Sequence, residues 1–537
     1  GLVEQLPRDR PLVSAKVHTA ADGGLVLDVF RFGAAAGFDS DNPAHQAKLD
    51  ATVAYARGLG EGSGESGLRS YVEQCSGDFV RAASPLRLYE TWRLTEQVRS
   101  TQEVACGLYR QTDPRLARIS VVCSQTDTRA FFERLVRHLG RVGFDITRAF
   151  VDVHASNDAD AVVSLGFVVK DPDGRLNDDA SPTWHALRSA MKRLRWLDTQ
   201  VLERLEIQPQ LNLIEAEILV TLTRLVHPVL APINPFAFTR DRLFDILDRQ
   251  PTIASKIART FIRRFIEQTG DQNDAAWSAI EQMVDSQVDA ATERQFFETL
   301  LSAAQKVHYT NLARENRLGL ALSVDASLFA RSDRQAPTSV AFVHADGTDG
   351  FHVRFRPIAR GGVRAVVPKG AEQYLREAER LFEEVYDLAM AQQLKNKDIP
   401  EGGAKGVVLV APGTTAEDGV KAYIDGLLDL IDAAPNEDRL YLGPDENISP
   451  PLIEWVVNRA SVRGYPEPTA FMSSKPGAGI NHKAFGVTSE GVTVFLEEAL
   501  KAAGIDPSRQ PFTVKMTGGP AAPSFGGKCG AAIDGDQ

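Results

Sequence analysis

The chain contains 537 residues, and at about 150 residues per domain this length predicts three to four domains. Hydrophobic residues make up 43% of the chain and charged residues 24%, a globular composition that argues against a disordered, collagen-like or disulfide-scaffold protein. The net charge is −11 and there is no dense basic tract, so neither nucleic acid nor an anionic membrane is an expected partner.

The cysteines and apolar runs indicate the compartment. Four cysteines occur without any C-x-x-C pair, which favours a reducing compartment, and we expect the cytoplasm or an organelle matrix. No run reaches the roughly 18 consecutive apolar residues of a membrane span. The chain starts at Gly1 without Met or a signal pattern, so we expect that an upstream portion was removed.

The first part of the chain predicts two strands, at 12–18 and 24–32, and then a helical stretch from about 42 to 101. A β-α-β-β run follows, with strands at 119–124, 146–156 and 161–170 and a helix at 128–143. This run resembles an ACT-type regulatory domain, a ferredoxin-like module that commonly senses amino acids. The alternative is a packed α+β spacer without a ligand.

Residues 180–335 have mostly helical spacing, and Thr239 is placed to cap a helix over 241–247. His185, His227 and His308 lack the spacing of metal ligands, so we interpret them as structural and expect no metal site.

The segment from Phe351 onward carries the candidate chemistry. An alternating strand runs into Arg360-Gly361-Gly362-Val363-Arg364, where glycines permit close backbone approach and arginines suit a carboxylate or phosphate. A salt-bridged structural loop would use the same residues. A helix over 371–396 follows, and Lys395 extends its apolar face; the alternative is a lysine that complements the helix dipole at the C-terminus.

Lys405 lies in a glycine-rich segment, Pro400 to Gly406, that we interpret as a tight turn before a strand at 407–410. Nearby cations (Lys395, Lys397, Arg360) would favour its neutral, reactive amine if they converge. A phosphate loop is excluded because Gly406, not Ser or Thr, follows the lysine.

Asp445 follows a short strand at 440–442, the usual position of a catalytic group in an α/β sheet, although an isolated turn there would be structural. Further on, polar loops at 473–477 and 481–483 precede a helix that runs to about residue 502, with Thr488 or Ser489 as its cap.

Four ordered motifs resemble the glutamate dehydrogenase superfamily, and specifically its large NAD-dependent members of fungi and bacteria. They lie at 358–364, 395–406, 443–447 and 483–489. The resemblance implies that Lys405 is the catalytic lysine that polarises the 2-oxo group and that Asp445 shuttles protons to and from ammonia. It further implies that Lys395 holds the substrate α-carboxylate, that Arg360 binds the side-chain carboxylate, and that Thr488 lies near the nicotinamide.

The chain departs from the family near its end. Residues 512–520, with Gly518 and Gly519, resemble the first strand and glycine turn of the NAD-binding domain, but the expected helix does not follow and the rest of a Rossmann domain is largely missing. We therefore expect a truncated chain that does not turn over alone.

The expected fold is multidomain α/β and α+β, with an ACT-like region, a helical region and a substrate domain of glutamate dehydrogenase type. The expected domains are a tail of an ACT-like domain at 1–34, a helical connector at 35–115, the ACT-like domain at 116–178, a helical domain at 179–340, the substrate domain at 341–485 and the start of the NAD-binding domain at 486–537. By resemblance the chain is an NAD-dependent glutamate dehydrogenase that converts glutamate to 2-oxoglutarate and ammonium, and is a homo-oligomer. The alternatives are a dicarboxylate-binding or amino-acid-binding module without redox turnover, and an assembly segment.

Overall fold

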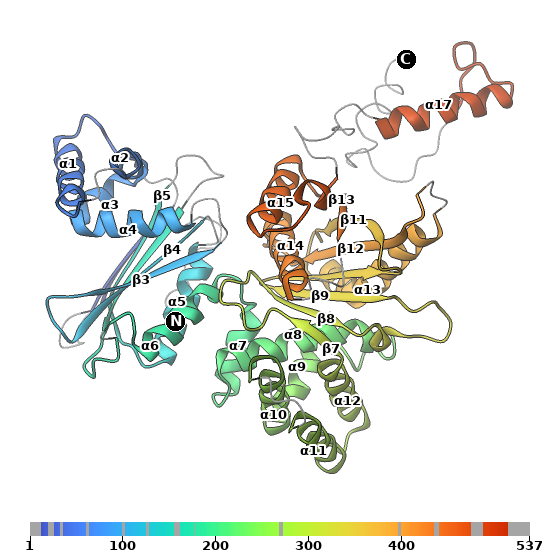
Figure 1. Ribbon diagram of the computed structural model, residues 1–537, viewed down its shortest axis with the longest axis horizontal. Coiled ribbons are helices and arrows are strands. Elements are labelled where there is room, and N and C mark those ends of the chain that lie inside the picture. Colours follow the sequence, from blue (N-terminus) through green and yellow to red (C-terminus); the bar gives the residue numbers. More distant parts are fainter. Residues whose placement is uncertain are drawn as a thin grey trace. The chain divides into compact units, whose positions relative to one another are not determined.

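The computed structural model describes residues 12–19, 26–32, 36–60, 64–98, 103–124, 128–154, 162–176, 178–267, 272–395, 399–433, 440–473 and 487–513. The chain divides into two compact units. The first contains Gly1–Leu197 and Arg314–Leu318, and the second contains Asp198–Ala313 and Gly319–Gln537. Both units combine helices with a β-sheet, which gives a mixed α/β architecture (Figure 1).

The first unit is built on a six-stranded antiparallel sheet in the order β2-β1-β5-β6-β4-β3. Its strands are β1 (Leu12–Thr19), β2 (Val26–Phe32), β3 (Val104–Arg110), β4 (Leu116–Ser124), β5 (Ile146–His154) and β6 (Val162–Lys170). Its helices are α1 (Pro43–Gly58), α2 (Glu65–Gln74), α3 (Gly77–Ala82), α4 (Pro85–Val98), α5 (Thr128–Arg141) and α6 (Pro182–Leu194).

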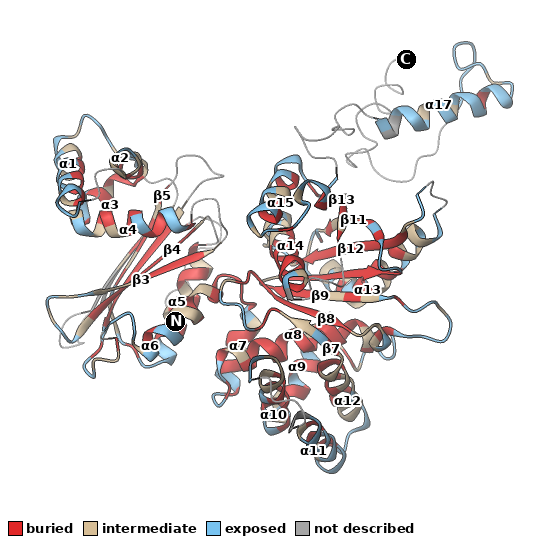
Figure 2. Ribbon diagram, viewed as in Figure 1, coloured by how far each residue is buried: buried red, intermediate tan, exposed pale blue. Residues whose placement is uncertain are grey.

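Both faces of this sheet are covered. β4 and β6 are buried along almost their whole length, and most of their residues are apolar (Figure 2 shows β4). Leu94 and Val98 of α4 pack on Val122 of β4, whereas Phe132 of α5 stacks on Phe167 of β6. The side chains of Val122 and Phe167 alternate to opposite faces of the sheet, so α4 and α5 cover different sides.

Two boundaries in this unit differ from the sequence prediction. β1 pairs with both β2 and β5, so residues 12–19 and 26–32 belong to the same sheet as the β-α-β-β run instead of forming part of a separate domain. The pairing of β1 with β5 joins strands far apart in the chain, which leaves no local signal in the sequence. β3 lies inside the segment interpreted as a helical connector and pairs with β4. The ACT-like assignment itself stays a prediction.

The second unit begins with helices α7 (Thr199–Ile207), α8 (Leu213–Leu230), α9 (Arg240–Arg249), α10 (Pro251–Ile262), α11 (Gln272–Gln287) and α12 (Ala291–Gln305). The hydroxyl of Thr239 accepts a hydrogen bond from the backbone N–H of Arg242, which confirms the predicted cap of α9. A seven-stranded sheet follows, made of β7 (Val307–Thr310), β8 (Leu320–Val324), β9 (Ser339–Ala345), β10 (Thr348–Arg354), β11 (Ala359–Val366), β12 (Gly402–Val410) and β13 (Tyr441–Pro444).

The strand order of the second sheet is β13-β11-β12-β10-β9-β8-β7. β7, β8, β9 and β10 are antiparallel to one another in turn and β10 is antiparallel to β12, whereas β11 runs parallel to both β12 and β13. β7, β8 and the first residues of β9 lie before residue 341. The expected boundary between the helical domain and the substrate domain is therefore placed too late. These strands are short, and the helical spacing of the preceding segment obscures them.

Helices cover both faces of this sheet. On one face, Phe382 of α13 (Ala371–Leu394) packs edge-to-face on Phe351 of β10. On the other face, Tyr423 of α14 (Ala416–Ala433) lies against Gly350 of the same strand. The remaining helices are α15 (Pro450–Val462), α16 (Pro468–Phe471) and α17 (Val487–Ala502). The buried interior of the sheet is drawn red in Figure 2.

Candidate functional site

Lys405 and Asp445, the two predicted catalytic residues, form an ion pair. Lys405 lies within β12 and is 5% exposed, while Asp445 directly follows β13 with its side chain 44% exposed. The Lys405 ammonium donates to Asp445 Oδ2. The structure therefore brings together a buried amine and a carboxylate that solvent or a ligand can reach.

Gly362 of β11 makes room for this pair. β11 lies between β12 and β13, so the two side chains must meet over it. A Cβ atom at Gly362 would lie 3.4 Å from Lys405 Nζ and 3.3 Å from Asp445 Cβ. These distances are tighter than most real Cβ contacts, so a side chain at this position would push against both partners.

The turn after β13 fixes the position of Asp445. The backbone N–H of Asp445 donates to Val363 O at 3.0 Å, and the Asn447 side-chain amide donates to Ala365 O at 2.7 Å. Asn447 has φ of 60°, the left-handed conformation that asparagine tolerates better than most residues. The turn is thus tied to β11 by backbone and side-chain bonds, as expected for a carboxylate at the carboxyl end of a strand.

The charges around Lys405 and Asp445 explain why the Asp445 carboxyl group is ionised. Burial raises the pKa of Asp445, but the hydrogen bond and the charge of Lys405 outweigh burial, so the net pKa of Asp445 is lowered. Glu384 on α13 has a raised pKa because it is partly buried, and Arg364 and Lys405 partly oppose that rise. Arg364 contacts Glu384 at 3.2 Å and Glu446 at 2.5 Å. The sequence analysis did not single out Glu384, because its contact with Arg364 depends on how α13 packs on β11.

Two segments predicted as turns are strands. Arg360 to Arg364 lies in β11, and Lys405 lies within β12 instead of in a turn before it. The glycines that suggested turns serve close packing, since a Cβ at Gly361 would lie 1.5 Å from Ala404 O and one at Gly403 would lie 2.1 Å from Gln393 N.

The two predicted carboxylate-binding residues lie in different settings. Arg360 Nε contacts Glu401 Oε1 at 3.1 Å, and the Arg360 side chain remains 52% exposed. Lys395 does not extend the buried stripe of α13, because the helix ends at Leu394 and Lys395 is exposed. The structure shows no convergence of Lys395 and Arg360 on Lys405 among the described residues.

The predicted cofactor residues are only partly described. Thr488 lies in the first turn of α17, but its side chain lies outside the described part of the structure. Gly518, Gly519 and Lys397 lie outside the described residues altogether. Ser473 was noted only as part of a polar loop; its Oγ would lie 3.3 Å from a Cβ at Gly443, next to the turn that carries Asp445.

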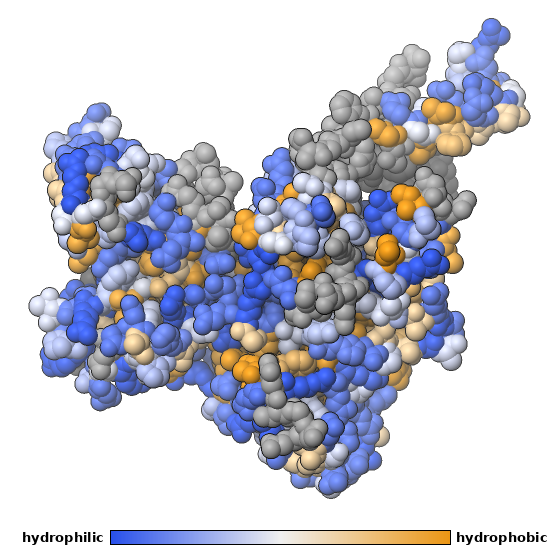
Figure 3. Space-filling model, in the orientation of Figure 1, coloured by the Kyte–Doolittle hydropathy of each residue, from blue (hydrophilic) through white to orange (hydrophobic). Residues whose placement is uncertain are grey.

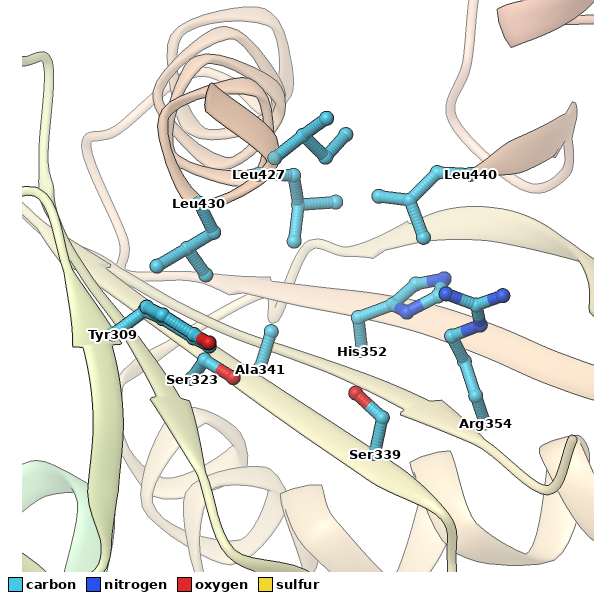
Figure 4. Close-up of a pocket in the computed structure, with 10 residues that line it drawn as sticks. Tyr309, Ser323, Ser339, Ala341, His352, Arg354, Leu427, Leu430 and Leu440 are labelled. Carbon is cyan, nitrogen blue, oxygen red and sulfur yellow. The ribbon is translucent and has the colours of Figure 1, made fainter. Parts of the chain in front are cut away.

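A cavity of about 50 Å³ lies on the opposite face of the same sheet (Figure 4). Leucines of α14 line it on one side and Ser339, His352 and Arg354 on the other. Val353 pairs with Lys405 across β10 and β12, so His352 and Arg354 point away from Lys405. Burial, and secondarily Arg354, lowers the pKa of His352 to about 3. This cavity is separate from the site at Lys405.

Two further features bear on the predicted sites. No group of three or more His, Cys, Asp or Glu side chains in the described ranges is arranged to hold a metal ion. Likewise, none of the described helices is long and apolar enough to cross a membrane. The face of the molecule drawn in Figure 3 is mostly hydrophilic.

Comparisons with known proteins show what the segment around this site is similar to. Residues 277–445, about a third of the chain, match the protein family described as bacterial NAD-glutamate dehydrogenase, catalytic domain. The matched range contains Arg360, Lys395, Lys405 and Asp445.

Individual relatives agree with the family match. The NAD-specific glutamate dehydrogenase of Saccharomyces cerevisiae is 28% identical over 336 residues, which are 56% of this chain and 30% of that protein. A probable NAD-specific glutamate dehydrogenase of Schizosaccharomyces pombe is 36% identical over 229 residues, 39% of this chain and 20% of that protein. The chain is thus a relative of the NAD-specific glutamate dehydrogenases of fungi and bacteria, which confirms the resemblance, and it spans less than a third of the length of these relatives.

A solved structure also overlaps part of the chain. It is the hetero-hexameric glutamate dehydrogenase of Thermus thermophilus in a Leu-bound form, with 24% identity over 43% of this chain and 48% of that chain and a TM-score of 0.23. With a TM-score of 0.23, this similarity carries no argument about the site.

Proposed function

We propose that this chain carries the substrate-binding and proton-transfer site of an NAD-dependent glutamate dehydrogenase, which interconverts L-glutamate with 2-oxoglutarate and ammonium. The observation that carries the proposal is the Lys405–Asp445 ion pair over Gly362. The names of its relatives support the same reaction.

The pair suits the chemistry of the α-carbon. The Lys405 ammonium, held in a buried position, donates to the 2-oxo oxygen and polarises the carbonyl group towards attack by ammonia. Asp445 is ionised and half exposed, so it accepts a proton from ammonium, which frees ammonia to attack the carbonyl carbon, and it later returns a proton to the hydroxyl group that leaves the carbinolamine as water. Oxidative deamination of glutamate uses the same two groups in reverse.

The substrate carboxylates are proposed to bind beside the pair. Arg360 lies in β11 on the same alternating face as Gly362, and Glu401 contacts its Nε while the side chain stays half exposed. The outer edge of the guanidinium can then form a bidentate pair with the side-chain carboxylate of the substrate. Lys395 is proposed to bind the α-carboxylate; its exposed position leaves it accessible but does not aim it at Lys405.

NAD is the proposed cofactor, and when bound it would supply the acceptor for the hydride that leaves the α-carbon of glutamate. Thr488, Gly518 and Gly519 are the proposed contacts, from family resemblance, and no described side chain tests them. We also propose a homo-oligomer on the same basis.

Calorimetric titration of the 537-residue chain with 2-oxoglutarate, with and without NADH, tests this function. Binding that is lost in Arg360→Ala supports the dicarboxylate site, and NADH oxidation with ammonium that disappears in Lys405→Ala supports the redox activity. Binding without NADH oxidation, unchanged in Lys405→Ala, would favour a dicarboxylate-binding module instead. No binding in either condition would contradict the proposed substrate site.

A further inference from the structure

Arg364 stands out among the residues around the catalytic pair because it contacts two carboxylates at once. It lies on the same face of β11 as Gly362, two residues further along the strand. Its Nη1 contacts Glu384 of α13 and its Nη2 donates to Glu446, the residue directly after Asp445. The three side chains are 24% to 51% exposed, so the contacts form at the edge of the site.

Glu384 can compete with Asp445 for the catalytic lysine. It lies within electrostatic reach of Lys405, whose charge lowers the pKa of Glu384, while Glu377 and Glu446 raise it. Lys405 nevertheless pairs with Asp445. Arg364 contacts Glu384 and Glu446 at the same time, because its rigid planar fork presents Nη1 to one carboxylate and Nη2 to the other.

Arg364 also braces the turn that carries Asp445. β13 has four residues and lies at the edge of the sheet, so few ladder bonds hold it. The contact from Arg364 to Glu446 adds to the bond from Ala365 N to Glu446 O and to that from Asn447 to Ala365. The same guanidinium thus connects α13, β11 and the catalytic turn.

We propose that Arg364 is a positioning residue which, by occupying Glu384 and Glu446, keeps Lys405 paired with Asp445. This inference rests on the proposed function, because the pair matters only if it handles the substrate. Arg364 itself touches no reacting atom. Its removal should let Lys405 exchange Asp445 for Glu384.

Zero-length crosslinking of the 537-residue chain with a water-soluble carbodiimide tests this exchange without any turnover. The reagent joins a lysine amine to the carboxylate that it contacts, and peptide mass spectrometry identifies the joined residues. Wild type should give the Lys405–Asp445 link. In Arg364→Gln the ratio of this link to a Lys405–Glu384 link should fall about tenfold, the factor that corresponds to one charge-assisted hydrogen bond.

Two further variants distinguish a positioning role of Arg364 from a general loss of structure. Arg364→Gln/Glu384→Gln should restore the Lys405–Asp445 link, because the competing carboxylate is gone. Arg376→Gln removes an exposed cation of α13 that contacts the exposed Glu372, and it should match wild type. A purely structural role for Arg364 would weaken the link without transfer to Glu384 and without rescue by the second substitution.

Circular dichroism checks that each variant folds. If Arg364→Gln does not fold, Arg364→Lys takes its place, because it keeps the charge but loses the fork; the same shift in a smaller amount is expected. If Arg364→Gln and Arg364→Lys gave the same ratio of Lys405–Asp445 to Lys405–Glu384 links as wild type, the positioning role would be overturned and the proposed function would stand. Absence of the Lys405–Asp445 link in wild type would instead contradict the pair on which both rest.

Discussion

Lys405 and Asp445 form an ion pair although their strands are not neighbours, because β11 separates β12 from β13. Side chains from two strands can meet over a third only where the middle strand has no side chain of its own. Gly362 meets this condition. The glycine is therefore part of the site, because it creates the space in which the amine and the carboxylate meet.

Replacement of this glycine should damage the site more than the fold. In Gly362→Ala the new methyl group lies 3.3 to 3.4 Å from Asp445 Cβ, Gly443 O and Lys405 Nζ, so small shifts relieve the contact. We expect a folded chain with a displaced ion pair and a fall in NADH-dependent amination of 2-oxoglutarate of about tenfold or more, about 1.4 kcal/mol in the barrier.

Gly361→Ala is the matched control, because its Cβ would lie 1.5 Å from Ala404 O and the strands would have to separate. That variant should unfold or lose several degrees of thermal stability. Thermal unfolding followed by circular dichroism and steady-state assays distinguish the two. If Gly362→Ala kept wild-type kinetics, the Lys405–Asp445 pair would not depend on the space that Gly362 leaves.

Arg360 provides a test of substrate recognition. If its outer edge binds the side-chain carboxylate, Arg360→Ala should weaken 2-oxoglutarate binding by about 1.5 to 3 kcal/mol, the value of a charged hydrogen bond. Glu401→Gln keeps the shape but loosens the orientation of Arg360, so a smaller loss is expected. Arg376→Ala on exposed α13 is the calorimetric control. Equal affinity in all three variants would remove Arg360 from the substrate site.

A buried ionic network joins the helices of the second unit to its sheet. Asp349 of β10 accepts from Arg240 of α9 at 2.7 Å and contacts His344 Nδ1 at 2.8 Å, and all three side chains are buried. Arg240 also donates to the hydroxyl of Tyr374 on α13. Asp349→Asn leaves the Arg240 charge without its partner, so we expect a loss of about 3 to 5 kcal/mol in the free energy of unfolding.

The same network predicts an acid-sensitive contribution. Burial raises the pKa of Asp349, but the charges of Arg240 and the bond from His344 outweigh burial and hold it far below its usual range. The stabilisation is therefore present above the unfolded-state pKa of about 4 and is lost as pH falls below it. Urea unfolding at pH 7 and pH 3 should show that the difference in unfolding free energy between wild type and Asp349→Asn becomes smaller at the lower pH. If this difference did not change with pH, the ionic network would be contradicted.

The helices and strands with strong periodicity were predictable from sequence. The ranges of α5, α9 and α13 and of β5 and β6 agree with the structure to within a few residues. The position of Asp445 after a strand was also predictable, because a short apolar run ends directly before it.

Glycine occurs both in turns and in closely packed strands, and the sequence pattern did not distinguish the two. Gly361 and Gly403 resemble turn signals, yet both lie in strands whose close packing excludes a Cβ. Helical spacing likewise extended α13 past Leu394 and placed Lys395 on a buried face that the helix does not reach. The contacts of Arg364 with Glu384 and Glu446 depend on how strands pair, which local spacing does not encode.

His154 provides a prediction in the first unit that is independent of the catalytic site. It is 4% exposed, and its ring packs between Tyr71 and Phe79, with ring centroids 5.6 and 5.0 Å away. Within the described ranges, neither ring nitrogen of His154 has a hydrogen-bond partner. Burial, and then the nearby Arg87, lowers the pKa of His154 to about 3. The neutral imidazole is thus an unsatisfied polar group in an apolar, aromatic setting.

His154→Phe should therefore stabilise the first unit by about 1 to 3 kcal/mol at neutral pH, because the unpaired ring nitrogens are removed and the aromatic packing is kept. The gain should grow as pH falls from about 6.5 towards 3, because the unfolded histidine then binds a proton that the folded one excludes. Urea unfolding of both chains at pH 7.5 and pH 4.5 measures the two effects. A variant less stable than wild type at both pH values would show that His154 has a polar partner which phenylalanine cannot replace.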